Sequence, residues 1–257
     1  MLSKAQISLI QALQHKKFRI QHNLFVVEGI KSVLEFTHSP YKVQKIFSTA
    51  DAHTKLDKIP QNIKCEIVSD ATFSKISSLK NPQGTLALVE LPSSPENINP
   101  ARLKGHHSVV LDDVQDPGNL GTIIRTAEWF GISHIICSKN TVDAFNPKVV
   151  QATMGALSRV TIDYVDIEEF INTVSLPTFA AVLDGQSIYT TDFGQEGLII
   201  MGNEGNGIRP SLLENINHKV TIPRIGQTES LNVAIATTVF CSELARQKLH
   251  IADINNK

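Results

Sequence analysis

The chain has 257 residues, of which 42% are hydrophobic, and a formal net charge of −1. This length suits one large domain or two of ordinary size, and the composition is typical of a globular protein with a substantial core. No stretch approaches the ~20 apolar residues that span a bilayer, and the N-terminus does not resemble a signal peptide. The cysteines and histidines lack disulfide or metal spacing. We therefore expect a cytoplasmic protein with no membrane partner and no metal.

The charge is unevenly distributed along the chain. Residues 1–105 contain 14 Lys and Arg against 8 Asp and Glu, whereas residues 106–257 contain 10 against 17. A basic first part suggests a polyanionic partner, although a lysine-rich solvated surface has the same composition.

The first part of the chain predicts a small α/β unit that begins with a helix over 3–17, with Ser3 as a candidate cap. A basic segment, 15–23, connects this helix to the first strand. The segment PSSPENINP at 92–100 is the best linker in the chain. Strands are expected at 24–29, 43–49, 64–70 and 84–91, and further helices at 30–36 and 71–79.

The second part alternates strands with helices, which predicts a largely parallel sheet with helices on both faces. Active sites of such sheets lie beyond the carboxyl ends of the strands. The expected strands are 108–112, 133–137, 178–183, 197–201 and 219–222, and the expected helices are 119–130, 146–155, 167–173, 209–215 and 230–249.

Three loops at predicted strand ends carry the candidate chemistry. The first belongs to LDDVQDPGNLGTIIRTAEWFG at 111–131, where Asn119 begins a helix that carries Arg125. Asn119 is either a helix cap or a functional amide, because an asparagine side chain satisfies free backbone N–H groups at a helix start. Arg125 is either a functional cation or one at the surface or in a dimer interface.

The other two loops are MGNEGNG at 201–207 and IPRIGQTESLN at 222–232. Glycines in the first permit close backbone approach to a ligand, and Glu204 between them can orient an arginine or a hydroxyl. Ser230 and Asn232 precede a helix, and Ser230 alone could be its cap. The small residues after them are typical of close helix packing. Dinucleotide, phosphate-loop and serine-hydrolase fingerprints do not occur.

Together, DPGNLGTIIRTA, MGNEGNGI and IPRIGQTESLNVAIATT resemble the three motifs of the SpoU family of RNA 2′-O-ribose methyltransferases, in the SPOUT superfamily. The resemblance covers about residues 107–250. KKFRIQHNLFVVEGIKSV and NPQGTLALVE resemble the substrate-binding domain of many members, itself similar to a ribosomal-protein RNA-binding fold. The implied organisation is an α/β substrate-binding domain at 1–95, a linker at 96–106 and a SPOUT domain with a deep trefoil knot at 107–257.

The resemblance also implies S-adenosylmethionine as methyl donor and a homodimer through the C-terminal domain. By motif match, backbone at Gly202, Ile222 and Leu231 holds the donor, and the same pocket is lined by Leu183, Asp184, Asn203, Gly205 and Ser230. The polar catalytic positions match Asn119, Arg125, Glu204, Ser230 and Asn232.

The family's proposed base corresponds to Arg125. An arginine side chain in water keeps its proton far above pH 7, so a base role requires the site to favour the neutral form. In the alternative role, Arg125 stays charged, binds the adjacent RNA phosphate and stabilises developing alkoxide.

We expect an RNA ribose 2′-O-methyltransferase whose substrate is structured RNA, with ribosomal RNA favoured over tRNA because of the long N-terminal part. Its RNA-binding residues are predicted to be Lys16, Lys17 and Arg19, through phosphates and RNA shape. The alternatives are a tRNA ribose methyltransferase and a non-catalytic RNA-binding protein that retains the fold. An α/β enzyme with another nucleotide cofactor is a third class, against which the missing fingerprint loops count.

Overall fold

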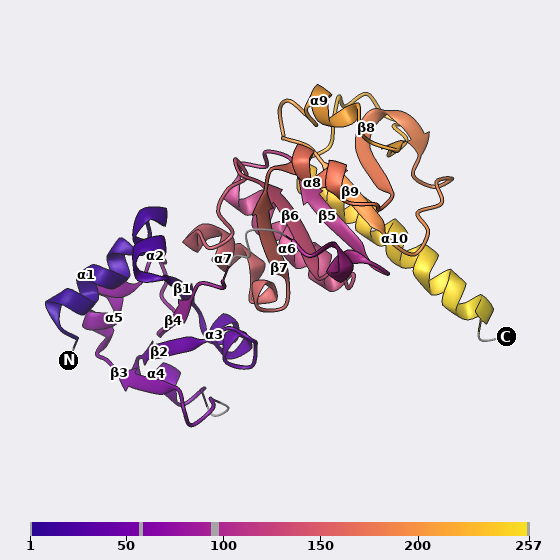
Figure 1. The fold of residues 1–257 in the computed structure, drawn as a ribbon. Coiled ribbons are helices and arrows are strands. Elements are labelled where there is room, and N and C mark those ends of the chain that lie inside the picture. Colours follow the sequence, from indigo (N-terminus) through magenta and orange to yellow (C-terminus); the bar gives the residue numbers. More distant parts are fainter. Residues whose placement is uncertain (1, 57–58, 94–97, 256–257) are drawn as a thin grey trace. The chain divides into compact units, whose positions relative to one another are not determined.

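The computed structural model describes residues 2–56, 59–93 and 98–255. The chain divides into two compact units, which are coloured along the sequence in Figure 1. Unit 1 comprises residues 1–93 and 143–159, and unit 2 comprises residues 94–142 and 160–257. The predicted second domain thus contributes the segment 143–159 to unit 1. The predicted boundary at residue 95 lies among residues 94–97, outside the described part of the chain.

Unit 1 is built on a mixed four-stranded sheet with the order β1-β4-β2-β3. Strand β4 pairs antiparallel with β1 and β2, while β2 and β3 are parallel. Every strand expected in the first part of the sequence is present. Their bounds are Leu24–Glu28 for β1, Val43–Ser48 for β2, Lys64–Ile67 for β3 and Thr85–Glu90 for β4.

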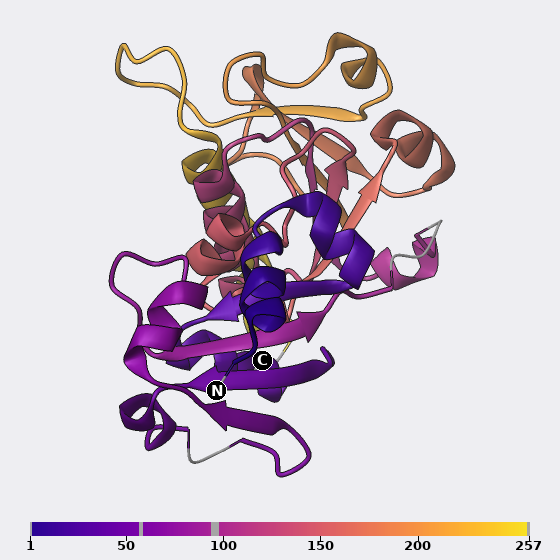
Figure 2. The ribbon, with the colours of Figure 1, turned by 90° about the vertical axis from the view of Figure 1, so that its left-hand side faces the viewer.

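The first helix is shorter than the sequence predicts. Helix α1 (Lys4–Ala12) begins with the expected cap at Ser3, which exchanges hydrogen bonds with Gln6 in a capping box. The segment expected as a basic connection instead forms helix α2 (Lys16–His22), which ends where Asn23 adopts a left-handed conformation. Figure 2 shows both indigo helices in front of the strands of unit 1. Unit 1 also contains α3 (Ile30–Thr37), α4 (Ala50–His53), α5 (Asp70–Ile76), α7 (Pro147–Thr153) and the 3-10 helix η2 (Ala156–Ser158).

Unit 2 is built on a six-stranded sheet with the order β10-β8-β9-β5-β6-β7, in which all pairs are parallel. The prediction of a largely parallel sheet is therefore confirmed. The strands are β5 (His107–Leu111), β6 (His134–Ser138), β7 (Thr161–Val165), β8 (Thr178–Ser187), β9 (Gly197–Met201) and β10 (His218–Thr221).

Two strands of this sheet differ from expectation. Strand β7 is not predicted from the sequence. It is an edge strand with one neighbour, and the polar Asp163 in its middle is tolerated because it is partly exposed there. Strand β8 extends beyond the predicted residue 183 to Ser187. Its ladder with β10 shifts register between Lys219 and Val220.

Helices of unit 2 begin near their predicted starts, except the last. Helix α10 begins at Val233 rather than at residue 230 and continues past the predicted end at 249. It packs against α6, where the hydroxyls of Thr126 and Thr238 lie 3.4 Å apart (Figure 1). The small residues at the start of α10 permit this approach. The helical bounds are η1 (Pro100–Leu103), α6 (Pro117–Trp129), α8 (Ile167–Thr173), α9 (Pro210–Leu213) and α10 (Val233–Asn255).

Within the described residues, no helix is long and apolar enough to cross a membrane. Among the same residues, no group of three or more His, Cys, Asp or Glu side chains could hold a metal ion. Cys137 and Cys241 are buried, as expected for small core residues. Burial raises the pKa of both thiols, that of Cys241 to about 12, so neither forms a nucleophilic thiolate near neutral pH.

Candidate active site at the carboxyl ends of the parallel strands

The first two marked loops begin side by side because their strands are neighbours in the sheet. Strands β5 and β9 are parallel, with Leu111 opposite Met201 at the end of each. The backbone N–H of Asp112 then donates to the Met201 carbonyl over 2.9 Å. The loops after both strands therefore leave the sheet at one edge, as expected for a site at the carboxyl ends of strands.

Helix α6 is capped by Asp116 and not by Asn119. The Asp116 carboxylate accepts from the backbone N–H of Asn119 over 2.8 Å, and Pro117 takes the first helical position, where its missing N–H is not needed. The interpretation of Asn119 as the cap is thus wrong, because the helix starts earlier than expected. The side chain of Asn119 is left to make other contacts.

Side chains from all three loops form one hydrogen-bonded chain. The amide nitrogen Nδ2 of Asn119 donates to Glu204 Oε1 over 2.9 Å. The amide oxygen of Asn119 accepts from Nδ2 of Asn232 over 3.0 Å. The structure thus brings together three of the five predicted catalytic residues, each from a different motif and up to 113 positions apart.

The start of helix α10 sets the direction of this chain. Asn232 Oδ1 accepts from the backbone N–H groups of Ala234 and Ile235, over 2.9 and 3.3 Å. Because these groups can only donate, Asn232 must turn its NH₂ toward Asn119. Asn119 then presents its oxygen to Asn232 and its own NH₂ to the Glu204 carboxylate. Each amide orientation follows from the previous one. The cap of α10 by Asn232 therefore fixes the orientation of the Asn119 amide that donates to Glu204.

The remaining two predicted catalytic residues are exposed. Arg125 lies on α6, six residues beyond Asn119, a rise of about 9 Å along the helix. Ser230 lies in the segment 222–232, before α10 begins. Asn232 occupies the capping position that the sequence analysis considered for Ser230, so that interpretation of Ser230 is wrong.

The loop after β9 is compact because its own polar groups close it. Backbone groups of Asn203 and Gly207 exchange two hydrogen bonds of 2.9 and 3.0 Å. The side-chain oxygen of Asn203 accepts from the N–H groups of Gly205 and Asn206, while its Nδ2 donates to the Asp113 carbonyl over 2.7 Å. At Gly202 the backbone of this loop passes so close that a Cβ atom has no room. Glu204 is therefore held at the tip of a rigid turn.

The residues predicted to bind the methyl donor outside this loop lie beside an interruption of the sheet. Strand β8 leaves its ladder with β10 between Ala180 and Gln186, so Leu183 and Asp184 do not pair there and are exposed. The hydroxyl of Thr221 donates to the Leu183 carbonyl over 3.1 Å. Leu231 is exposed and Ile222 is half-buried. All eight predicted donor residues thus lie in segments that follow or interrupt strands β8, β9 and β10.

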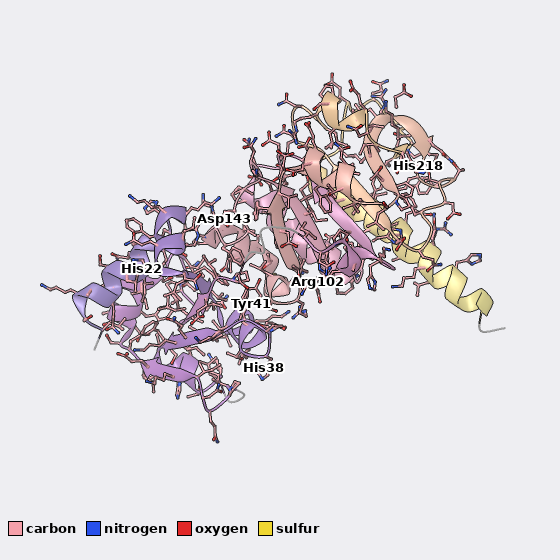
Figure 3. The ribbon with its side chains drawn as sticks, viewed as in Figure 1. His22, His38, Tyr41, Arg102, Asp143 and His218 are labelled. Carbon is pink, nitrogen blue, oxygen red and sulfur yellow. The ribbon has the colours of Figure 1, made fainter. Side chains whose placement is uncertain are left out.

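One predicted RNA-binding residue is not at the surface. Arg19 is 2% exposed, and its guanidinium donates to the carbonyls of Leu13 and Gln14 and to Asp143 Oδ2, the last over 2.6 Å. Asp143 belongs to unit 1 and is labelled in Figure 3. A phosphate cannot reach a guanidinium so enclosed, so the expectation that Arg19 binds RNA is corrected. Lys16 and Lys17 lie exposed on α2.

Replacing Arg19 by methionine should lower the free energy of unfolding by about 3 kcal/mol, because removal of one partner leaves a poorly solvated carboxylate uncompensated. The shift of the urea midpoint measures this loss. Lys17→Met on the same helix is the control, and its effect should stay within about 0.5 kcal/mol because Lys17 is exposed. Equal midpoints for the two variants would show that the Arg19–Asp143 pair contributes nothing.

The chain is similar to known proteins over both of its parts. Residues 106–242, more than half of the chain, match the model of the SpoU rRNA Methylase family. The chain belongs to the SpoU rRNA methylase family. Residues 4–87 match the MRM3-like substrate binding domain, so both parts of the predicted resemblance are confirmed.

Relatives of this family member resemble it over nearly its whole length. The 23S rRNA (guanosine(2553)-2'-O)-methyltransferase RlmP of Bacillus subtilis is 30% identical over 236 residues, which cover 90% of this chain and 92% of the relative. The structure of a TrmH-family RNA methyltransferase from Porphyromonas gingivalis is 37% identical, with a TM-score of 0.86, and covers 96% of this chain and 99% of that one. The AdoMet-bound rRNA methyltransferase from Sinorhizobium meliloti is 32% identical, with a TM-score of 0.84 and 97% of each chain covered.

Three residues of the site were missed by the sequence analysis. Asp116 caps α6, and the buried Asp112 binds Arg209 across the loops. The two aspartates stand in the segment LDDVQDPGN, where an acidic residue directly before a Pro-Gly pair is itself a helix-start signal. No local signal identifies Arg209, because its partner lies 97 positions away.

Proposed function

We propose that this protein transfers a methyl group from S-adenosylmethionine to a ribose 2′-OH of ribosomal RNA. The observation that carries the proposal is the chain of hydrogen bonds from Glu204 through Asn119 to Asn232, which joins all three SpoU motifs at one edge of the sheet. The Bacillus relative that shares most of this chain's length is named for methylation of a guanosine 2'-O position in 23S rRNA.

The loop after β9 fits the methyl donor. A Cβ atom at Gly207 would meet nothing within 4 Å, so backbone in this loop faces open space, while Gly202 keeps the turn compact. Glycine backbone that no side chain covers, beside exposed apolar side chains, suits a ligand with polar and apolar parts. S-adenosylmethionine, when bound, supplies a methyl group on a sulfonium. Backbone at Gly202, Ile222 and Leu231 is proposed to hold it, with Leu183, Asp184, Asn203, Gly205 and Ser230 around it.

The side chains of the site then have to orient a hydroxyl and accept its proton. A ribose 2′-OH must lie in line with the sulfur–methyl bond, and such positioning supplies several kcal/mol of the acceleration. The Glu204 carboxylate, held by Asn119, is placed to orient the hydroxyl or a cation. Arg125 acts either as the base or as a fixed charge that binds RNA phosphate and stabilises the developing alkoxide.

Replacing Arg125 by lysine should reduce turnover whichever role Arg125 has. Lysine lacks the planar guanidinium group, which binds phosphate or carboxylate through two hydrogen-bond donors. The pH–rate profile separates the roles. If Arg125 is the base, the substitution moves the limb of the pH–rate profile that reports ionisation of residue 125. If Arg125 is a fixed charge, the substitution lowers the rate by the same factor at every pH. An unchanged rate would exclude both roles.

RNA is proposed to bind unit 1 through phosphates, with Lys16 and Lys17 among the contacts. This proposal fits the match of residues 4–87 to a substrate binding domain. Residues 1–95 are accordingly proposed as the RNA-binding part, and residues 107–257 as the catalytic part.

Three further features are proposed from the family resemblance: a trefoil knot, a homodimer through the C-terminal part, and a cytoplasmic location. The first rests on the match of residues 106–242 to the SpoU rRNA Methylase family. Exposed apolar side chains on α6, on α10 and in the segment before α10 support the second, since exposed apolar surface can mark a protein interface. They are Trp129, Ile225, Leu231 and Ile235.

The proposed function is tested by incubating the protein with S-adenosylmethionine labelled in its methyl group and either ribosomal RNA or tRNA. Incorporation into ribosomal RNA at a 2′-O position is expected, and the position is found by comparing 2′-O-methyl maps of a deletion strain and its parent. Incorporation into tRNA alone would favour the tRNA alternative. Absence of donor binding in calorimetry would favour a non-catalytic RNA-binding protein.

A further inference from the structure

Asp112 contacts both ends of the loop that carries Glu204. Its backbone N–H donates to the carbonyl of Met201, the residue that precedes the loop. Its carboxylate accepts from Arg209, the residue that follows Ile208. Oδ2 takes the backbone N–H of Arg209 over 3.0 Å, and Oδ1 takes the Nε–H over 2.9 Å. One residue at the end of β5 therefore closes the base of the loop 202–208.

The Asp112–Arg209 pair fixes the end of the loop 202–208. Asp112 is fully buried, and a buried carboxylate is tolerated only when charge and hydrogen bonds compensate it. Arg209 supplies both, so movement of the loop end would leave that carboxylate unpaired. Arg209 is anchored a second time, because its Nη1 lies 3.3 Å from Glu168 Oε1, which also accepts from Ser211.

A second hydrogen bond joins the loop 202–208 to the residues that follow β5. Nδ2 of Asn203 donates to the carbonyl of Asp113, and Asp113 has a φ of 63°, in the left-handed region. Aspartate is among the residues that adopt this conformation at moderate cost. The backbone reversal at Asp113 follows directly after Asp112, so adjacent residues hold the start and the end of the loop.

We propose that Asp112 and Arg209 are positioning residues for methyl transfer, which act by fixing the loop that presents Gly202 to the donor and Glu204 to Asn119. This inference rests on the proposed function of the site. Neither side chain needs to touch donor or RNA. Their effect is expected in donor binding and not only in protein stability.

The test compares Arg209→Gln with Arg246→Gln. Both arginines lie in unit 2 and pair with a buried carboxylate: Arg209 is 47% exposed beside Asp112, and Arg246 is 60% exposed beside Glu243. Arg246 lies on α10 and its partner is three residues away, so it holds no loop of the site. The two variants should lose similar stability, which makes the second a matched control.

We expect Arg209→Gln to raise the KM for S-adenosylmethionine roughly tenfold relative to Arg246→Gln, the effect of one lost charge-assisted hydrogen bond. Arg209→Lys, which retains the charge, should recover part of this loss. Asp112→Asn combined with Arg209→Gln should add little to the single variant, because both act through one contact. Equal KM values for the two glutamine variants would overturn the proposal.

A measurement without turnover separates this proposal from the proposed function. Hydrogen exchange of the backbone amides at 203–207 should accelerate in Arg209→Gln and stay unchanged in Arg246→Gln. Unchanged exchange in Arg209→Gln would overturn the positioning role even if the enzyme is active. An unsubstituted protein that transfers no methyl group, with accelerated exchange in Arg209→Gln, would instead contradict the proposed function and retain the role of the pair in holding the loop.

Discussion

Replacing Gly202 by alanine should weaken donor binding and reduce turnover roughly hundredfold, where the hundredfold is the rate penalty of misplacing reacting groups by about 1 Å. The Cβ of the new residue would lie closer than 3.0 Å to backbone atoms of Gly207 and Ile208, a distance that real Cβ atoms essentially never show. Backbone cannot rotate aside as a side chain can, so the turn 202–208 has to open. Both the proposed donor contact at residue 202 and the position of Glu204 then change.

Gly197→Ala is the control for this prediction, because Gly197 begins the same strand, β9, at its opposite end. A Cβ there would meet the ring of Phe179 at 2.9 Å and the Pro177 carbonyl at 3.1 Å. Overpacking of this kind costs about 1–3 kcal/mol of stability. We expect donor affinity, measured by calorimetry, to fall in Gly202→Ala and to be retained in Gly197→Ala. Equal donor affinities in the two variants would show that the turn after β9 does not hold the donor.

The location of the site can be predicted from the sequence, whereas most contacts between its side chains cannot. Alternating strands and helices imply a parallel sheet, and a parallel sheet places the loops after β5 and β9 at one edge, whatever the details of packing. The selection of Asn119, Glu204 and Asn232 from these segments rests on their match to the SpoU motifs. The capping alternatives for Asn119 and Ser230 are wrong, since helices α6 and α10 start two or three residues away from their expected positions.

Features set by long-range contacts were missed for a different reason. Arg19 stands in a basic, polar segment, and its local pattern is that of a surface cation. It is buried because Asp143, 124 positions later, approaches it. The pairing of Asp112 with Arg209 has the same origin. Composition and periodicity report what a residue prefers alone, and a charged residue becomes buried only when folding supplies its partner.

Replacing Asn232 by aspartate should leave the protein folded and reduce turnover roughly hundredfold, the usual effect of losing one oriented hydrogen-bond donor in an active site. Aspartate caps a helix as well as asparagine does, so α10 keeps its N-terminal hydrogen bonds and stability changes by no more than about 0.5 kcal/mol. The new carboxylate has no N–H to give to Asn119. The Asn119 amide must then turn over to donate to it, and this turns its oxygen toward Glu204.

The outcome of that reversal is two oxygens in contact, so Glu204 loses the hydrogen bond from Asn119 and keeps the longer one, 3.4 Å, from the backbone N–H of Asp116. Asn232→Ala provides the comparison, because it removes the cap and the donor together and should cost about 1 kcal/mol of stability as well as activity. Thermal unfolding and single-turnover methyl transfer measure the two effects separately. If Asn232 serves only as a helix cap, Asn232→Asp will be fully active and Asn232→Ala will lose stability alone. A stable but inactive Asn232→Asp variant is the result expected if the amide of Asn232 acts through Asn119 on Glu204.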